Sequence, residues 1–108
     1  MGASEKFEKS LIDTIDSQLK HVFGETATLV IYNYLQTALS LPQKEIPKKL
    51  ETFTEGLDRF LSSGARVVEK VILEDLYSDF GQEFQVKEGY RFPDYVKELK
   101  AAIERCGP

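Results

Sequence analysis

Apolar residues recur through most of the chain at the three- and four-residue spacing of a helical face. In the first stretch, polar residues occupy the opposite face, and the apolar positions are Phe7, Leu11, Ile12, Ile15, Leu19, Val22 and Phe23. This pattern predicts a first helix over about 7–22, with Ser4 as its N-cap. Gly24 is expected to interrupt the helix, because glycine alone leaves a helix in the left-handed conformation without steric cost. A second helix is predicted over about 25–39.

The second predicted helix is apolar around nearly its whole circumference. Its apolar residues are Leu29, Val30, Ile31, Tyr32, Tyr34, Leu35, Ala38 and Leu39. A helix with this pattern is normally buried on all sides. We therefore expect either a central helix wrapped by the others or a helix that keeps one face for a partner chain.

The rest of the chain predicts three more helices separated by prolines and glycines. Pro42 and Pro47 favour a short connection, followed by a third helix that starts near Pro47 or Thr52 and ends at 62–64. A fourth helix is predicted over about 65–80, with Val67, Val68, Val71, Ile72, Leu76 and Phe80 buried. Residues 82–91 read as an extended arm or a weak hairpin. Pro93 is well placed to begin the last helix, which Gly107 is expected to end.

The predicted fold class is therefore all-α. We expect one domain over 1–108, a compact bundle of about five helices built from two helical hairpins plus a C-terminal helix. Residues 1–6 are expected to be a flexible tail and 106–108 a frayed end.

The two predicted hairpins align with each other at an offset of 38 residues. When 12–39 is laid on 50–77, apolar positions coincide, for example Leu19 with Leu57 and Leu29 with Val67. Such agreement favours an internal duplication with approximate two-fold symmetry. The alternative is that any two amphipathic hairpins share this period.

Composition and charge narrow the classes of partner. The chain has 108 residues, of which 42% are hydrophobic and 30% charged, a balance typical of a globular protein. Its 14 basic and 18 acidic residues give a net charge of -4, which disfavours nucleic acid and membrane surfaces as partners. The start shows no signal peptide, no apolar run is long enough for a membrane span, and Cys106 is the single cysteine. We therefore expect a cytoplasmic protein.

No cluster of residues has the spacing that a known chemistry requires. His21 is the only histidine, and we interpret it as a polar-edge residue rather than a base or metal ligand. Asp75 and Asp79 share a helical face, which we interpret as solvated. The glycines are scattered, so no phosphate-binding loop is indicated. We predict no enzymatic activity, no cofactor, no metal and no small-molecule substrate, and we interpret Cys106 as an idle thiol.

Aromatic residues give the remaining signal for function. They are concentrated in the second predicted helix and the arm, and tyrosine and phenylalanine are enriched in protein interfaces. The predicted interaction surface consists of Tyr32, Tyr34, Tyr90, Phe92 and Tyr95. We expect it to bind a protein partner or a second copy of the chain.

Three short segments resemble a known family. They are Phe23-Gly24-Glu25, Glu45-Ile46-Pro47 and the stretch Gly64-Ala65-Arg66-Val67-Val68-Glu69. Together they resemble a small archaeal family of output domains named after Nitrosopumilus, often found at the end of archaeal signalling proteins. The resemblance implies a small helical fold and a signalling role, and it supplies no catalytic residues.

Two hypotheses from different classes follow. The first is a protein-interaction or dimerisation module, whose working surface is an exposed portion of the second helix or the aromatic arm. The alternative is a regulator linked to nucleic acid, with a helix-turn-helix at Gly24 or Gly64 and with phosphate contacts from Lys48, Lys49 or Arg66. Lys44, Lys48 and Lys49 form a small basic patch, which we interpret as a solvated linker. An enzyme ranks third.

Overall fold

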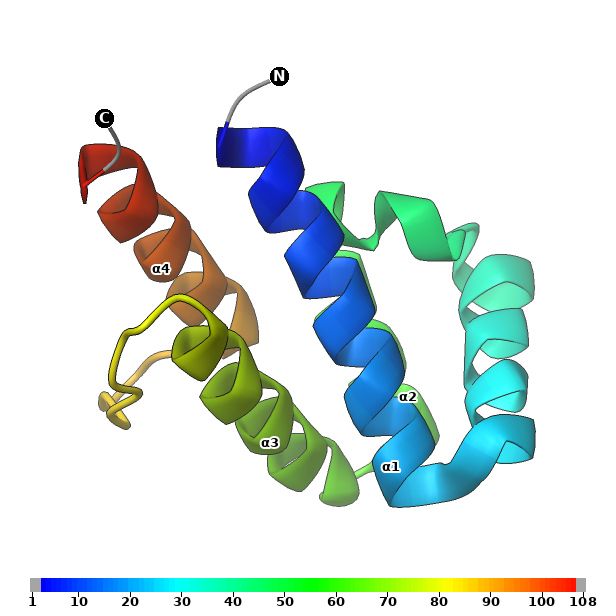
Figure 1. Ribbon diagram of the computed structural model, residues 1–108. Coiled ribbons are helices and arrows are strands. Elements are labelled where there is room, and N and C mark those ends of the chain that lie inside the picture. The colour runs from blue at the N-terminus through cyan, green and yellow to red at the C-terminus, as the bar shows by residue number, and fades with distance from the viewer. Residues whose placement is uncertain (1–2, 107–108) are drawn as a thin grey trace.

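The longest helical element, α1, runs from Ala3 to Leu39 and bends at Gly24. The computed structural model describes residues 3–106 of the chain (Figure 1). Gly24 has φ 86° and ψ 169°, a region of backbone space that is essentially restricted to glycine. The predicted interruption at Gly24 is confirmed, although its ψ is extended rather than left-handed helical.

The start of α1 lies earlier than the sequence predicted. The helix begins at Ala3, so residues 3–6 are helical rather than a flexible tail, and Ser4 lies inside the helix instead of capping it. Residues 1 and 2 lie outside the described part of the chain.

The bend folds the two segments of α1 back on each other. The hydroxyl of Tyr32 donates a hydrogen bond of 2.9 Å to Oδ1 of Asp16, and these two residues lie at equal distances along the chain from Gly24. The segments before and after Gly24 therefore form the first hairpin, as predicted. In Figure 1 they run side by side in opposite directions.

Four further helices complete the fold. They are the short 3-10 helix η1 (Gln43–Lys48), α2 (Leu50–Leu61), α3 (Gly64–Asp79) and α4 (Phe92–Cys106). Within residues 3–106 the fold is thus all-helical, with five helices and no strand, and the predicted fold class is confirmed. The two predicted helices on either side of Gly24 are the two segments of α1, which are separated by the non-helical backbone of Gly24. The difference from the prediction is η1, which forms within the proline-rich connection.

The arm over 82–91 contains neither helix nor strand, only a turn at 88–89. This matches the predicted extended arm and excludes the alternative of a weak hairpin. The end predicted for the last helix, Gly107, lies outside the described residues.

The core is centred on the first segment of α1. This segment buries Phe7, Leu11, Ile15 and Leu19 at a spacing of four residues, and α1 contacts each of the other helices. The other helices contribute buried side chains to the same cluster, among them Leu35, Phe53, Leu57, Val68, Ile72, Leu76, Phe92, Val96 and Leu99. The apolar stripes of the sequence therefore meet in one core.

Several apolar residues that were predicted to be buried are exposed. Val67 is 65% exposed and Val22 is 44% exposed. The second segment of α1 is not wrapped on all sides, since Leu29 and Val30 are 65% and 50% exposed. Of the two expectations for this helix, the structure therefore supports the one in which a face stays open.

The two hairpins pack on each other in a repeated manner. Near the middle of the first segment of α1, Gln18 donates a hydrogen bond of 2.9 Å to Asp75 of α3. The 38-residue offset relates Gln18 to Gly56 of α2. A Cβ on Gly56 would lie 2.4 Å from Cδ2 of Leu35 and 2.9 Å from Cδ1 of Leu39. The first helix of each hairpin thus packs on the second helix of the other.

The turns of the two hairpins also correspond. The same offset relates Gly24 to Ser62, and both have a positive φ, 86° and 52°. The duplication hypothesis gains support from this agreement, because the equivalent residues share a positive φ and the hairpins share an apolar pattern.

Candidate functional site

The aromatic residues predicted on the second segment of α1 are half-buried. Tyr32 is fixed by its hydrogen bond to Asp16, and it accepts a second one of 3.3 Å from Gln43. Burial, followed by the hydrogen bond to Asp16, raises the pKa of its hydroxyl. The ring of Tyr34 packs on Phe60 of α2, with 5.3 Å between ring centroids. Both tyrosines mainly join elements of the fold and leave only an edge to solvent.

Two of the aromatic residues predicted around the arm belong to the core. Phe92 is 1% exposed and packs on Phe53, with 5.7 Å between ring centroids, and Tyr95 is 7% exposed. The sequence prediction was therefore wrong to place Phe92 and Tyr95 on an interaction surface, because Phe92 is buried against α2 and Tyr95 is buried under the arm. Tyr90 is 37% exposed and remains at the surface.

The outer side of the second segment of α1 forms a surface that lacks charge. Six exposed residues fall within a sector of about 120° on this helix, namely Thr26, Leu29, Val30, Asn33, Gln36 and Thr37. We call these six residues the uncharged face. No charged residue occurs anywhere in 26–43, although 30% of the chain is charged. Depletion of charge is the compositional feature that distinguishes the centre of a protein interface from other surface.

The position of the uncharged face follows from the packing of its helix. Ile31 and Leu35 point into the core at a spacing of four residues, and the helix lies close to α2 at Gly56. Leu29 and Val30 consequently project outward. The sequence signal for this face is the uncharged stretch 26–43 rather than the aromatic residues.

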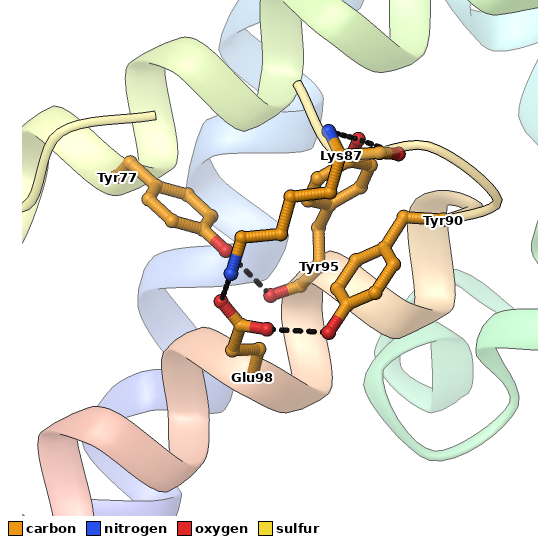
Figure 2. A network of polar contacts seen from close by, with 5 residues as sticks. All are labelled: Tyr77, Lys87, Tyr90, Tyr95 and Glu98. Atoms are coloured by element: carbon orange, nitrogen blue, oxygen red, sulfur yellow. Dashed lines mark hydrogen bonds and ion pairs between the residues drawn. The ribbon is translucent and has the colours of Figure 1, made fainter. Parts of the chain in front are cut away.

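The arm is held against α4 by a network of polar contacts, which Figure 2 shows. The hydroxyl of Tyr95 accepts a hydrogen bond of 2.7 Å from the backbone N–H of Lys87 and donates one of 3.1 Å to the carbonyl oxygen of Lys87. The carboxylate of Glu98 pairs with the ammonium of Lys87 and accepts a hydrogen bond of 2.7 Å from the hydroxyl of Tyr90. The hydrogen bonds from Lys87 and Tyr90 lower the pKa of Glu98.

Below this network an aromatic cluster joins the arm to α3. Phe84 packs edge-on against Tyr77 and also packs against Tyr95, with ring centroids 5.3 and 5.0 Å away. The hydroxyl of Tyr77 donates a hydrogen bond of 2.8 Å to the carbonyl oxygen of Tyr95, and burial raises the pKa of Tyr77 to about 12. The arm is thus a fixed strap rather than a free loop.

A cavity of about 210 Å³ lies between α3 and this strap. We call it the arm cleft. Its α3 wall carries Arg66, Glu69 and Lys70, and its opposite wall includes Phe84 and Tyr90. Glu69 is 5% exposed, so the cleft places a nearly buried acidic residue among cationic and aromatic side chains.

Two buried polar atoms at the arm cleft lack hydrogen-bond partners. They are Oε2 of Glu69 and Nε of Arg91. The Nη2 atom of Arg91 binds the carboxylate of Asp58 at 3.0 Å. Burial raises the pKa of Glu69, and Asp58 adds to this effect, whereas Arg91 and Arg66 oppose it. No local motif indicates this site, because its residues come from α3, the arm and α4.

The chemical candidates from the sequence are not brought together. His21 is exposed at the end of the first segment of α1. Asp75 and Asp79 accept hydrogen bonds from Gln18 and Thr14 of α1, so they join two helices. Among the described residues no group of three or more histidine, cysteine or acidic residues could hold a metal ion. The side chain of Cys106 lies outside the described part of the chain.

The cations of the nucleic-acid hypothesis do not share a surface. Lys48 ends η1, whereas Arg66 lies in the first turn of α3, and Figure 1 shows these two points at opposite ends of the bundle. Lys49 pairs with Glu45 at 3.2 Å, and Lys44 and Lys48 are exposed.

The chain has no significant match among protein-family models, curated proteins or solved structures. The resemblance to archaeal output domains therefore stays a prediction. Within residues 3–106 no helix combines the length and the apolar character that crossing a membrane requires.

Proposed function

We propose that this protein acts as a non-catalytic interaction module and that it self-associates through the uncharged face. The observation that carries the proposal is the exposure of Leu29 and Val30 on a helix surface without charge. Burial of these two side chains is favourable, and no charged group loses its hydration when the face is covered.

A second copy of the chain is the occupant that best fits the charge distribution. The chain carries a net charge of -4, so two copies repel each other in most orientations. Contact through the second segment of α1 brings together the part of the chain that has no charge and keeps the acidic residues apart. Two identical uncharged faces also satisfy the requirement of a two-fold dimer that each patch meets itself.

Aromatic residues at the edge of the uncharged face enlarge its apolar surface. Phe60 of α2 is 40% exposed and stacks on Tyr34, which neighbours Val30 on the helix. The polar members of the face are hydroxyl and amide groups, which can form hydrogen bonds across an interface. The cytoplasmic location and the role in signalling remain parts of this proposal, and the latter is the role that the resemblance implies.

The test is the solution mass, measured by light scattering behind size exclusion across an about tenfold range of protein concentration. We expect a dimer whose fraction grows with concentration. Val30→Glu should produce a monomer, because dimerisation would then bury a carboxylate without a counter-charge.

The matched control is Val67→Glu on α3. Val67 and Leu29 have the same exposed fraction of 65% and are related by the 38-residue offset, but Val67 is flanked by charged side chains. Val67→Glu should leave the mass unchanged. A strict monomer in the unmodified protein would contradict self-association and would direct the search to a different protein as partner.

A further inference from the structure

The arm cleft carries acidic and basic groups within one turn of a single helix. On α3, Arg66 is three residues before Glu69 and four before Lys70, so the side chain of Arg66 lies beside each of the other two. Arg66 and Lys70 are exposed and form no ion pair within residues 3–106. The α3 wall can therefore offer an anion site and a cation site at the same time.

The unpaired atoms point to a ligand with both a donor and an acceptor. A buried polar atom without a hydrogen bond is unfavourable and needs an explanation, and a bound ligand that supplies the missing partner is one such explanation. Here the acceptor Oε2 of Glu69 and the donor Nε of Arg91 both lack partners, and both residues line the arm cleft. Such a pair suits a molecule that carries a positive and a negative group on neighbouring atoms.

The size and the walls of the cleft limit the rest of the ligand. Its volume of about 210 Å³ is below the roughly 300–1,000 Å³ of sites for drug-sized ligands, which disfavours nucleotides. Leu73, Phe84, Val86 and Tyr90 give its walls an apolar and aromatic character. The network around Glu98 holds the outer wall in place, so the ligand need not order the arm.

We propose that the arm cleft binds a free α-amino acid with an apolar side chain. The ammonium group pairs with Glu69. The carboxylate accepts a hydrogen bond from Nε of Arg91, and Arg66 or Lys70 balances its charge. In an α-amino acid the ammonium and carboxylate groups are both attached to the α-carbon. Their short separation suits acidic and basic side chains that are neighbours on one helical face. The side chain of the ligand lies against Phe84 and Tyr90. This proposal is independent of the self-association proposed above.

The test uses L-phenylalanine as the probe and follows backbone amide signals by NMR during titration. We expect saturable shifts at Leu73, Phe84 and Tyr90. Two comparison ligands each lack one charge, since 3-phenylpropionate has no ammonium group and phenethylamine has no carboxylate. The affinity of each should be at least about tenfold lower than that of L-phenylalanine, because one charge-assisted contact is lost.

Variants separate the proposed contacts from a general effect on the fold. Glu69→Gln should weaken the binding of L-phenylalanine by about tenfold and leave the binding of 3-phenylpropionate unchanged. Only L-phenylalanine has an ammonium group that can pair with the carboxylate of Glu69. Lys70→Gln and Arg66→Gln change exposed residues, and at least one of them should weaken both ligands. Glu55→Gln, an exposed residue of α2, is the matched control and should change neither.

Three results would overturn the proposal. They are the absence of saturable shifts, shifts confined to residues outside the arm cleft, and an affinity for L-phenylalanine that Glu69→Gln leaves unchanged. The solution mass plays no part in these outcomes, so a failure here is distinguishable from a failure of the self-association proposal.

Discussion

The two hairpins of this protein share a framework but differ in what covers them. Leu29 and Val67, which the 38-residue offset relates, are both 65% exposed. At the next position of each helix the exposures differ. Val30 is 50% exposed, whereas its equivalent in α3, Val68, is 3% exposed. The arm and α4 follow α3 and pack on it, and no segment of residues 3–106 covers Val30.

Charge differs between the hairpins as well. The second segment of α1 has no charged residue after Glu25, whereas α3 has Arg66, Lys70 and Glu74 on exposed positions. An exposed helix normally carries charge on its outer side. The first hairpin therefore leaves exposed a helix side whose equivalent in the second hairpin is covered by the arm and α4.

The largest expected loss of stability comes from a substitution that disrupts the close contact between the hairpins. Gly56→Val should destabilise the protein by about 1–3 kcal/mol, because a larger side chain overpacks the contact with Leu35 and Leu39. Chemical denaturation measures this change. The matched control is Gly64→Ala, where a Cβ meets only Leu61 at 3.9 Å, and this change should stabilise the protein slightly. Equal effects of the two variants would contradict the repeated packing.

The next largest loss of stability is expected where the arm packs over the second hairpin. Tyr95→Phe should cost about 1–2 kcal/mol, because two hydrogen bonds to the backbone of Lys87 are lost. Faster hydrogen exchange at the Lys87 amide should accompany the loss. Tyr90→Phe removes only a hydrogen bond at the surface and should stay within about 0.5 kcal/mol of the unmodified protein. If Tyr95→Phe behaved like Tyr90→Phe, the arm would not be fixed by this network.

The smallest effect is a pH dependence that belongs to α3 alone. Because burial raises the pKa of Glu69 in the folded state, the folded protein binds a proton more readily than the unfolded chain. Stability should therefore fall as the pH rises from the unfolded pKa of Glu69 to its folded pKa, and it should stay reduced above this range. Glu69→Gln should flatten this part of the profile, as measured by urea denaturation at several pH values. An unchanged profile would show that Glu69 is not the group responsible.

The sequence predicted the helical framework well, because the framework depends on local signals. Apolar spacing located the helices, and Gly24 marked where the first of them ends. The sequence could not say that α1 starts at Ala3 or that η1 forms between Pro42 and Lys49, because both depend on how the chain packs. Boundaries of this kind are decided by tertiary contacts rather than by local preference.

The surfaces were harder to predict for the same reason. Phe92 and Tyr95 look like interface residues in the sequence, and only the path of the arm shows that they are covered. The arm cleft combines residues from 66 to 95, so no local motif indicates it. The uncharged stretch 26–43 was visible in the sequence, but the structure was needed to show which of its residues face outward.

The most direct test of self-association is cross-linking between copies through single cysteines placed on the uncharged face. In a Cys106→Ser background, Leu29→Cys, Asn33→Cys and Gln36→Cys are oxidised separately, since a disulfide requires Cα atoms about 4.4–6.8 Å apart. Because a residue close to the two-fold axis meets its own copy, at least one of the three should form a covalent dimer in high yield. Val67→Cys should form no covalent dimer, although Val67 is as exposed as Leu29. Efficient cross-linking at Val67 with none on the uncharged face would contradict the account.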